Sequence, residues 1–309
     1  MNPVGHAGFG AGLALPAFAK INLGLELLGR RPDGYWEIRT LYQTVALHDR
    51  LRLRLTRASG ALEVRVRGGG APAGRANLIH RLLARARRLL GLRRGVEVEL
   101  EKEIPAGRGL GGGSSDAAAA LIGLLRLARI RLPLAEMARL GAQVGADVPF
   151  FFLGGRALGV SRGDEVHALE DASAGVAVLV CPPLPIVTRE AYRWAGEGAR
   201  RLTPGKPAAI IVRRPLLANA LWAAGNDFEP VVFARFPELA RIKRALFRAG
   251  AWQAGLSGSG STVYGLFARR AAARRAAAVC VEAGTVFVVD TVGRGAYRRA
   301  TGLAAVIEE

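Results

Sequence analysis

The chain has 309 residues, about two domains at the usual domain size, and half of the residues are hydrophobic. Only 22% are charged, so the chain has enough apolar surface for a core and is not disordered as a whole. Its two cysteines, Cys181 and Cys280, exclude a disulfide framework and a four-thiolate zinc site, and we expect a reducing, cytoplasmic location. Prolines interrupt the longest uncharged stretches, 1–19 and 172–187, so we expect no membrane helix and no signal peptide.

The net charge of +19 comes from 44 basic and 25 acidic residues. All but four of the basic residues are arginine, which indicates a preference that runs through the whole chain rather than a groove for nucleic acid. The arginines between 81 and 94 are expected on the solvated face of a helix, and no aromatic residues alternate with them to stack on bases. We therefore expect no nucleic-acid partner.

In the first part of the chain, alternating apolar and polar residues predict strands at 17–28, 38–47, 51–55, 62–66 and 96–100. The first strand places Lys20 and Asn22 on one face. The strands at 51–55 and 62–66 are expected to be half-buried and antiparallel. Helices are predicted over 77–90 and 115–129, and a third helix opens near Pro133.

The pattern starts again after Asp171 with an apolar strand, which indicates a second domain. The strands predicted there are 175–181, 251–256, 262–268 and 285–290, and the helices are 188–195, 215–224, 237–249 and 270–283. Because helices and strands mix without a regular βαβ repeat, we predict an α+β protein with domains over 1–168 and 169–309.

The most informative motif is the glycine-rich segment 105–116, which follows a strand and runs into an alanine-rich helix. Glycines let backbone amides approach a ligand and a helix N-terminus favours anions, so the segment predicts a phosphate-binding loop. It is not a Walker A loop, because no lysine follows its last glycine. Ser114 and Ser115 could instead cap the helix, although a cap would require none of the glycines.

Three further features are candidates for the same site. Asp147 stands among the apolar residues of 145–152, where a carboxylate is either paired or functional, although it could also cap the turn ahead of Pro149. Lys20 would usually be solvated on a strand, but a buried lysine needs a carboxylate, and Asp147 is a candidate partner. A second small-residue loop, 256–261, is either a hairpin turn or the other side of a ligand cleft.

These residues carry a family resemblance. Segment 105–116 resembles the phosphate-binding motif of the GHMP kinases, the superfamily of galactokinase, homoserine kinase, mevalonate kinase and phosphomevalonate kinase. One branch of that superfamily, which acts in the non-mevalonate isoprenoid pathway, is similar in four more blocks, at 19–23, 33–35, 145–150 and 256–260. The blocks stand in the correct order and cover most of the chain.

The resemblance implies a fold and a reaction. The N-terminal domain would resemble domain 2 of ribosomal protein S5 and bind ATP, and the C-terminal domain would be ferredoxin-like. ATP and Mg²⁺ are the implied cofactors, and the γ-phosphoryl group would pass to an alcohol on a small-molecule substrate that carries cytidine diphosphate. A monomer or a homodimer would be compatible. Because phosphoryl transfer has a loose transition state, catalysis would depend on positioning and on neutralising charge.

Carried over residue by residue, the resemblance implies that Asp147 accepts the hydroxyl proton and that Lys20 orients it and stabilises negative charge. The ATP phosphates would be wrapped by Pro105, Ala106, Gly107, Arg108, Gly109, Leu110, Gly111, Gly112, Gly113, Ser114 and Ser115. Ser115 would also contact the magnesium ion, and Asn77 and Lys102 would lie near the nucleoside. The acceptor would be bound by Asn22, Tyr35, Trp36, Thr188, Tyr192 and Gly258, with its cytosine between Tyr35 and Tyr192.

Three features depart from the family pattern. Trp36 stands where a histidine usually hydrogen-bonds the cytosine, and an indole offers one donor and no acceptor. Arg108 lies inside the glycine loop, where a small residue is usual, and it either reaches a phosphate or points to solvent. Residues 1–10 precede the usual first strand and are assigned no function. The alternatives are a GHMP kinase with another acceptor and a nucleic-acid-binding protein on a kinase fold.

Overall fold

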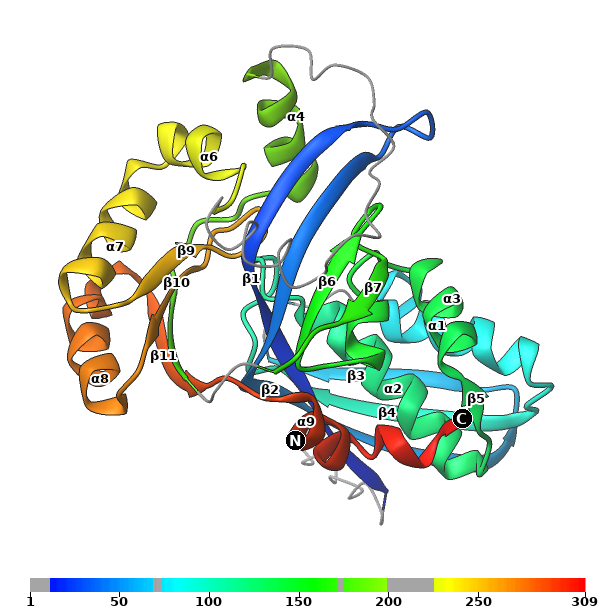
Figure 1. Cartoon of the computed structure of the whole chain (residues 1–309). Coiled ribbons are helices and arrows are strands. Elements are labelled where there is room, and N and C mark those ends of the chain that lie inside the picture. The colour runs from blue at the N-terminus through cyan, green and yellow to red at the C-terminus, as the bar shows by residue number, and fades with distance from the viewer. Residues whose placement is uncertain (1–11, 69, 71–73, 172–174, 199–224, 309) are drawn as a thin grey trace, which may run out of the picture.

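The computed structural model describes residues 12–68, 70, 74–171, 175–198 and 225–308. It contains two units, each a sheet with helices against it, and a long antiparallel hairpin extends from one unit to the other (Figure 1). The predicted α+β architecture is confirmed. The predicted helix at 215–224 and the segment 1–10 lie outside the described residues.

Strands β1 (Leu13–Arg30) and β2 (Trp36–Ser59) form the hairpin. The predicted segments 38–47 and 51–55 are therefore parts of one strand. Phe18 pairs with His48 whereas Ala19 pairs with Val45, so β2 holds two extra residues at this point. This β-bulge lets the strand continue while its apolar alternation changes phase, and the change of phase is what had suggested two segments.

The larger sheet has the order β3-β4-β2-β6-β7, and β1 pairs with β2. Its other strands are β3 (Leu62–Arg67), β4 (Arg94–Glu101), β6 (Arg156–Val160) and β7 (Glu165–Ala168). The antiparallel expectation holds for 51–55 but is wrong for β3, which runs parallel to β4. The 3-10 turn η1 (Gly74–Ala76) and helix α1 (Leu78–Leu89) connect these two strands, and a parallel pair needs such a crossover.

Helix α2 (Gly112–Ala128) is the centre of the larger core and packs against β1, β2 and α1. Its four consecutive alanines, 117–120, are buried and let the strands approach the helix closely. Helix α3 (Leu134–Ala142) follows, and the 3-10 turn η2 (Pro149–Phe152) adds three buried phenylalanines to the same core.

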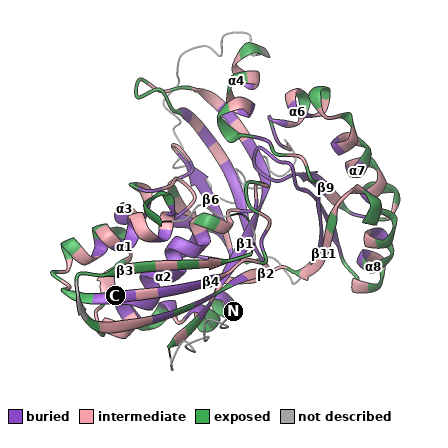
Figure 2. Ribbon diagram, turned by 180° about the vertical axis from the view of Figure 1, so that it is seen from behind, coloured by how far each residue is buried: buried purple, intermediate pink, exposed green. Residues whose placement is uncertain are grey.

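The smaller sheet has the order β11-β8-β10-β9. Its strands are β8 (Val176–Cys181), β9 (Gln253–Leu256), β10 (Val263–Phe267) and β11 (Thr285–Asp290). Helices α7 (Pro237–Arg248) and α8 (Arg270–Val279) pack against these strands, and α4 (Thr188–Gly198) contacts α6 (Glu229–Arg235). A separate apolar cluster that includes Leu41 and Leu179 joins the smaller sheet to the hairpin, where buried residues run along β1 (Figure 2).

The end of the chain returns to the larger unit. After the 3-10 turn η3 (Val281–Ala283) and β11, helix α9 (Arg294–Thr301) packs on β1. The turn η4 (Leu303–Ala305) then leads to β12 (Ile307–Glu308), which pairs in parallel with β5 (Leu132–Pro133). The domain boundary at 168/169 stays a prediction. Segment 294–308, which follows that boundary in the sequence, packs on the larger unit. No helix in the described ranges has the length and apolar character needed to cross a bilayer.

Candidate active site

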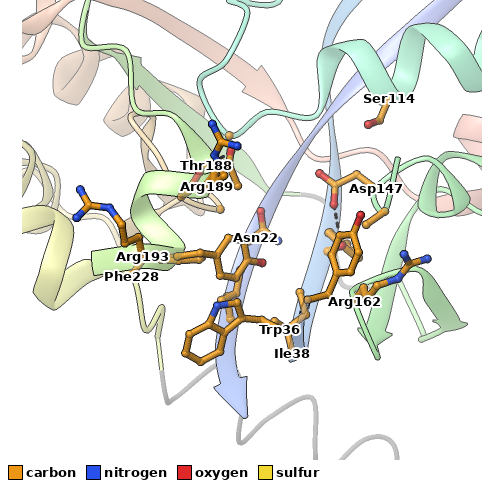
Figure 3. Close-up of a pocket in the computed structure, with 18 of the residues that line it drawn as sticks. Asn22, Trp36, Ile38, Ser114, Asp147, Arg162, Thr188, Arg189, Arg193 and Phe228 are labelled. Atoms are coloured by element: carbon orange, nitrogen blue, oxygen red, sulfur yellow. Dashed lines mark hydrogen bonds between the residues drawn. The ribbon is translucent and has the colours of Figure 1, made fainter. Parts of the chain in front are cut away.

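A cleft of about 760 Å³ lies between the two units, beside β1, the loop before η2 and helix α4 (Figure 3). Ten of the predicted site residues line it, namely Lys20, Asn22, Tyr35, Trp36, Gly109, Ser114, Asp147, Thr188, Tyr192 and Gly258. The structure therefore brings together segments that are far apart in the sequence.

The ammonium group of Lys20 is the centre of the polar part of the cleft. Its Nζ lies 3.3 Å from Oδ2 of Asp147 and donates a hydrogen bond of 2.6 Å to Oδ1 of Asn22. The Lys20 side chain is 4% exposed and that of Asp147 is 33% exposed. The pair that was predicted from the sequence is therefore present, with a buried ammonium and a carboxylate that is partly open to the cleft. This carboxylate compensates a charge that would be costly to bury alone.

Tyr42 on β2 contacts the other oxygen of the carboxylate, and sequence analysis missed it. Its hydroxyl donates to Oδ1 of Asp147 at 2.9 Å. Burial and the Asp147 carboxylate raise the pKa of Tyr42 well above its ordinary value, so the phenol remains a donor. Tyr42 pairs with Asn22 in the hairpin, so a prediction of the β1–β2 strand register would have identified Tyr42 as a site residue. Within the described residues, Asp147 accepts no backbone hydrogen bond, so it does not cap the turn.

The glycine-rich segment forms a tight turn before α2. Gly107, Gly109 and Gly111 have positive φ angles of 66°, 78° and 70°, which favour glycine. The residue before the helix is Gly111 and no side chain caps α2, so neither serine acts as a cap. Ser114 lines the cleft, whereas Ser115 is buried and its Oγ has no hydrogen-bond partner in the described part of the chain.

The glycine loop touches the second small-residue loop, which connects β9 and β10. Ser257 Oγ donates to the carbonyl oxygen of Gly109 at 2.9 Å, and the N–H of Thr262 donates to that of Arg108 at 3.2 Å. A Cβ on Gly109 would lie 2.0 Å from the Ser257 carbonyl oxygen, so this contact requires glycine. The Arg108 side chain donates to Ser261 Oγ at 3.3 Å. It therefore points to the other unit, and not simply to solvent.

Aromatic side chains form the wall of the cleft opposite the loops. The rings of Trp36 and Tyr192 stack with their centroids 6.1 Å apart, and Phe228 meets Tyr192 edge-on. Burial and the Asp147 carboxylate raise the pKa of Tyr192, so its phenol is neutral. Tyr35 is 58% exposed and available to a ligand.

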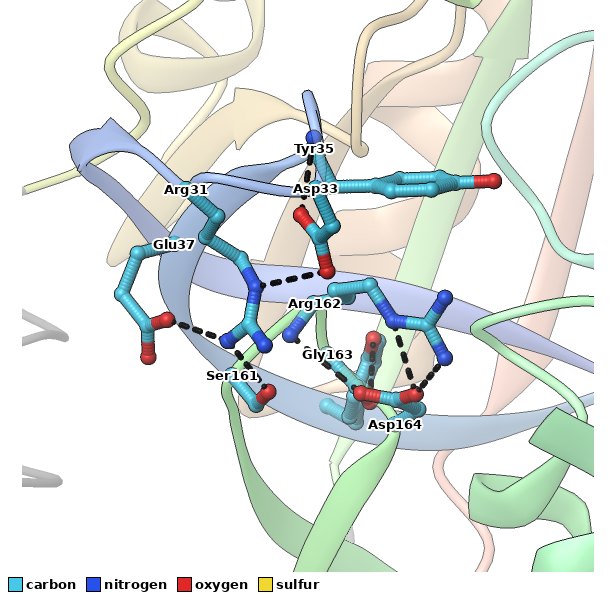
Figure 4. A network of polar contacts seen from close by, with 9 residues as sticks. Arg31, Asp33, Tyr35, Glu37, Ser161, Arg162, Gly163 and Asp164 are labelled. Atoms are coloured by element: carbon cyan, nitrogen blue, oxygen red, sulfur yellow. Dashed lines mark hydrogen bonds and ion pairs between the residues drawn. The ribbon is translucent and has the colours of Figure 1, made fainter.

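A polar network holds the tip of the hairpin, where Tyr35 lies (Figure 4). Arg31 donates to Glu37 at 2.6 Å and to Ser161 Oγ at 2.9 Å, which ties the tip to the turn between β6 and β7. In that turn Arg162 pairs with Asp164, and its guanidinium carbon lies 5.0 Å from the centre of the Tyr35 ring. Arg162 also lines the cleft, and sequence analysis had not singled it out.

Two residues that were expected near a nucleoside have structural partners. The Asn77 side chain accepts a hydrogen bond from the N–H of Ile79 and caps α1. The Lys102 side chain is 2% exposed, and its ammonium contacts Asp49 and Asp116. Neither Asn77 nor Lys102 lines the cleft between the units.

An open cleft, a glycine turn at a helix N-terminus and a lysine–aspartate pair define a class of protein, the kinases that phosphorylate small-molecule alcohols. Sequence profiles for the GHMP kinases N terminal domain and GHMP kinases C terminal match residues 77–155 and 213–285. The chain belongs to the GHMP kinases and, among them, to the family of 4-diphosphocytidyl-2-C-methyl-D-erythritol kinases.

Relatives and solved structures agree with this assignment. The chain is 42% identical over 296 residues to the 4-diphosphocytidyl-2-C-methyl-D-erythritol kinase of Solibacter usitatus, a match that covers 92% of this chain and 90% of the relative. With the enzyme of the same name from Pelotomaculum thermopropionicum it shares 42% identity over 266 residues, 85% of this chain and 91% of the relative.

A crystal structure of 4-(cytidine 5'-diphospho)-2C-methyl-D-erythritol kinase superposes with a TM-score of 0.73 at 33% identity, over 91% of this chain and all of the other. Homoserine kinase from Cytophaga hutchinsonii has a TM-score of 0.67 at 18% identity, over 94% of this chain and 98% of the other, and shows the shared fold alone.

Proposed function

We propose that the protein transfers the γ-phosphoryl group of ATP to the 2-hydroxyl group of 4-diphosphocytidyl-2-C-methyl-D-erythritol, a step in the non-mevalonate route to isoprenoid precursors. The observation that carries this proposal is the pair of Lys20 and Asp147, which lines the cleft beside the glycine loop. Relatives that bear this name align with most of the chain. The protein is thus an ATP-dependent small-molecule kinase.

In the proposed reaction Asp147 accepts the proton of the acceptor hydroxyl group. The hydroxyl oxygen forms a bond to the γ-phosphorus of ATP while the bond to the leaving oxygen of ADP breaks. Lys20 stabilises the negative charge that develops, and its contacts with Asn22 and Asp147 hold it in place. Because the transition state is loose, this positioning contributes more to the rate than the strength of the base.

We assign the ATP phosphates to the glycine loop, 105–115, where backbone amides and the N-terminus of α2 favour anions. Mg²⁺, when bound, neutralises charge on the phosphates. The buried Ser115 hydroxyl lacks a hydrogen-bond partner and is the protein group that we assign to the ion. The described residues contain no group of three or more acidic, histidine or cysteine side chains that could hold a metal, which suits an ion bound mainly by phosphates.

We assign the acceptor to the aromatic side of the cleft. Its cytosine would contact Tyr35 and the stacked rings of Trp36 and Tyr192. Asn22, Thr188 and Gly258 would contact its polar groups. Four arginines also line the cleft and suit an anionic diphosphate, namely Arg30, Arg162, Arg189 and Arg193.

We also propose a cytoplasmic location. Both Cys181 and Cys280 are free and buried in the structure, which suits a reducing compartment. We propose that the functional form is a monomer or a homodimer, because one chain contributes all the residues that we assign to the site.

A coupled assay of ADP release tests the proposed function. Activity should require ATP, Mg²⁺ and the cytidine-containing alcohol, and it should be absent with homoserine or mevalonate. The presence of Trp36 favours one alternative, a kinase of the same superfamily with another acceptor. Turnover of a cytidine-free alcohol in preference to the cytidine-containing one would establish that alternative.

A further inference from the structure

Three charged side chains are buried together beneath the glycine loop. Lys102, which follows β4, has its Nζ 2.5 Å from Oδ2 of Asp49 on β2 and 2.7 Å from Oδ2 of Asp116 on α2. The three side chains are at most 2% exposed. They therefore form a buried charged triad that none of the assigned roles explains.

The triad connects both ends of the loop. Before the loop, Oδ1 of Asp49 accepts hydrogen bonds from the N–H groups of Glu103 at 2.6 Å and Ile104 at 2.8 Å. After the loop, Asp116 belongs to the first part of α2. Lys102 bridges the two carboxylates, so it joins the two ends to each other and to β2.

The ammonium lies directly under the start of α2. A Cβ on Gly112, the first residue of the helix, would lie 3.1 Å from Nζ of Lys102. A side chain at Gly112 would therefore force Lys102 or Ile104 to shift. This geometry also places the compact charge of a lysine where anionic phosphates are expected above the helix N-terminus.

Two buried carboxylates below an anion site would repel phosphates and would be costly without a positive partner. The carboxylates are crowded, because their Oδ2 atoms lie 2.5 Å and 2.7 Å from the same Nζ of Lys102. Lys102 offsets their charge and, within the described residues, is the cation that contacts both.

We propose that Lys102 is a positioning residue for ATP, which fixes the two ends of the glycine loop and offsets the buried negative charge beneath the bound phosphates. It acts through the loop and does not contact the nucleoside, in contrast to the role that the family resemblance implied. The inference rests on the proposed kinase function.

The test compares Lys102→Met with two other variants of the full chain. In Lys102→Met/Asp116→Asn one buried carboxylate is removed together with the ammonium, and Asp49 keeps its two backbone donors. In the control Arg67→Met, an arginine of the neighbouring strand β3 that pairs with Glu99 is replaced, and its carbonyl oxygen, which accepts the Lys102 N–H, is kept. The readouts are ADP affinity by calorimetry, KM for ATP, KM for the cytidine substrate and the thermal midpoint.

We expect Lys102→Met to raise KM for ATP about a hundredfold and to weaken ADP binding by a similar factor, because a displaced loop loses its aligned donors. In the double variant both quantities should change only about tenfold. KM for the cytidine substrate should change less than about twofold, and Arg67→Met should match the wild type in all three constants. If Lys102→Met does not fold, the double variant carries the test. Unchanged ADP affinity in a folded variant, or equal losses for ATP and acceptor, would overturn the inference. ADP binding needs no acceptor, so a wild type that is inactive on the cytidine substrate contradicts only the proposed function.

Discussion

The Lys20 ammonium lies 3.3 Å from the carboxylate of Asp147, although one residue comes from the first strand and the other from the loop after α3. The ammonium is buried and the carboxylate is one-third exposed. Of the two, Asp147 is therefore the more accessible to a hydroxyl group in the cleft. The buried lysine and the Tyr42 hydroxyl hold the carboxylate in a single orientation.

The first prediction concerns this carboxylate. Asp147→Asn should lower kcat by about a hundredfold to ten-thousandfold, the usual contribution of a positioned acid or base. ADP affinity should stay within about twofold of the wild type, because the glycine loop is unchanged. Coupled ADP release and calorimetry measure the two quantities. Asp290→Asn, which removes an exposed carboxylate paired with Arg270, is the control. An Asp147→Asn enzyme with normal turnover would show that the base is misassigned.

The second prediction concerns the aromatic wall. Trp36 is 9% exposed, and a Cβ on Gly196 would lie 3.3 Å from its Cζ2, so the wall is shaped around the indole. Trp36→His should therefore raise KM for the cytidine substrate about tenfold and leave KM for ATP unchanged. Steady-state kinetics with each substrate varied in turn checks this. A lower KM for the cytidine substrate would mean that histidine serves the pocket better than tryptophan does.

The third prediction concerns Arg108. Its side chain donates to Ser261 on the other unit, so Arg108→Ala should change KM for ATP by less than about threefold. Ser261→Ala is the matched variant, and the double variant should be no worse than the more affected single one. Measuring KM for ATP in the three variants shows whether the Arg108 side chain contacts Ser261 or the phosphates. A rise above about tenfold in Arg108→Ala alone would assign the guanidinium to the phosphates instead.

The fourth prediction concerns pH. Burial, and the nearby Asp49, raise the pKa of Asp116 well above its ordinary value of 3.8, so the folded protein binds this proton more tightly than the unfolded chain. The stability that Asp116 contributes is full below its unfolded pKa and is lost as pH rises through the folded value. Relative to Asp116→Asn, the wild type should lose unfolding free energy as pH rises from about 4 towards neutral. Urea titrations across this range measure it, and parallel curves for the two proteins would contradict it.

Most of the helices and strands could be predicted because their signals are local. The alternation in β1, the short apolar run of β10 and the alanines of α2 each lie within one short stretch of sequence. The parallel pairing of β3 with β4 could not be predicted in the same way, because it depends on where α1 returns the chain. The short elements β5, β12 and α6 leave too few residues for any period to appear.

The sequence predicted those site residues that either require a charged partner or match the motifs of the family. A buried lysine needs a carboxylate, and this requirement pointed from Lys20 to Asp147. The same requirement applies to Lys102, but the sequence does not show that its partners are Asp49 and Asp116. Which side of the glycine loop a lysine occupies depends on the packing of three elements, and that is a tertiary property.

The bulged hairpin of β1 and β2 carries Lys20 in its middle and Trp36 at the far end. A single ribbon of paired backbone therefore fixes the span between the phosphoryl-transfer centre and the wall assigned to the base. The length of this ribbon therefore sets the length of the ligand that can occupy both ends of the site. An insertion or deletion of one residue pair in the outer half of the hairpin would alter the length of molecule that fits, without touching any group that performs chemistry.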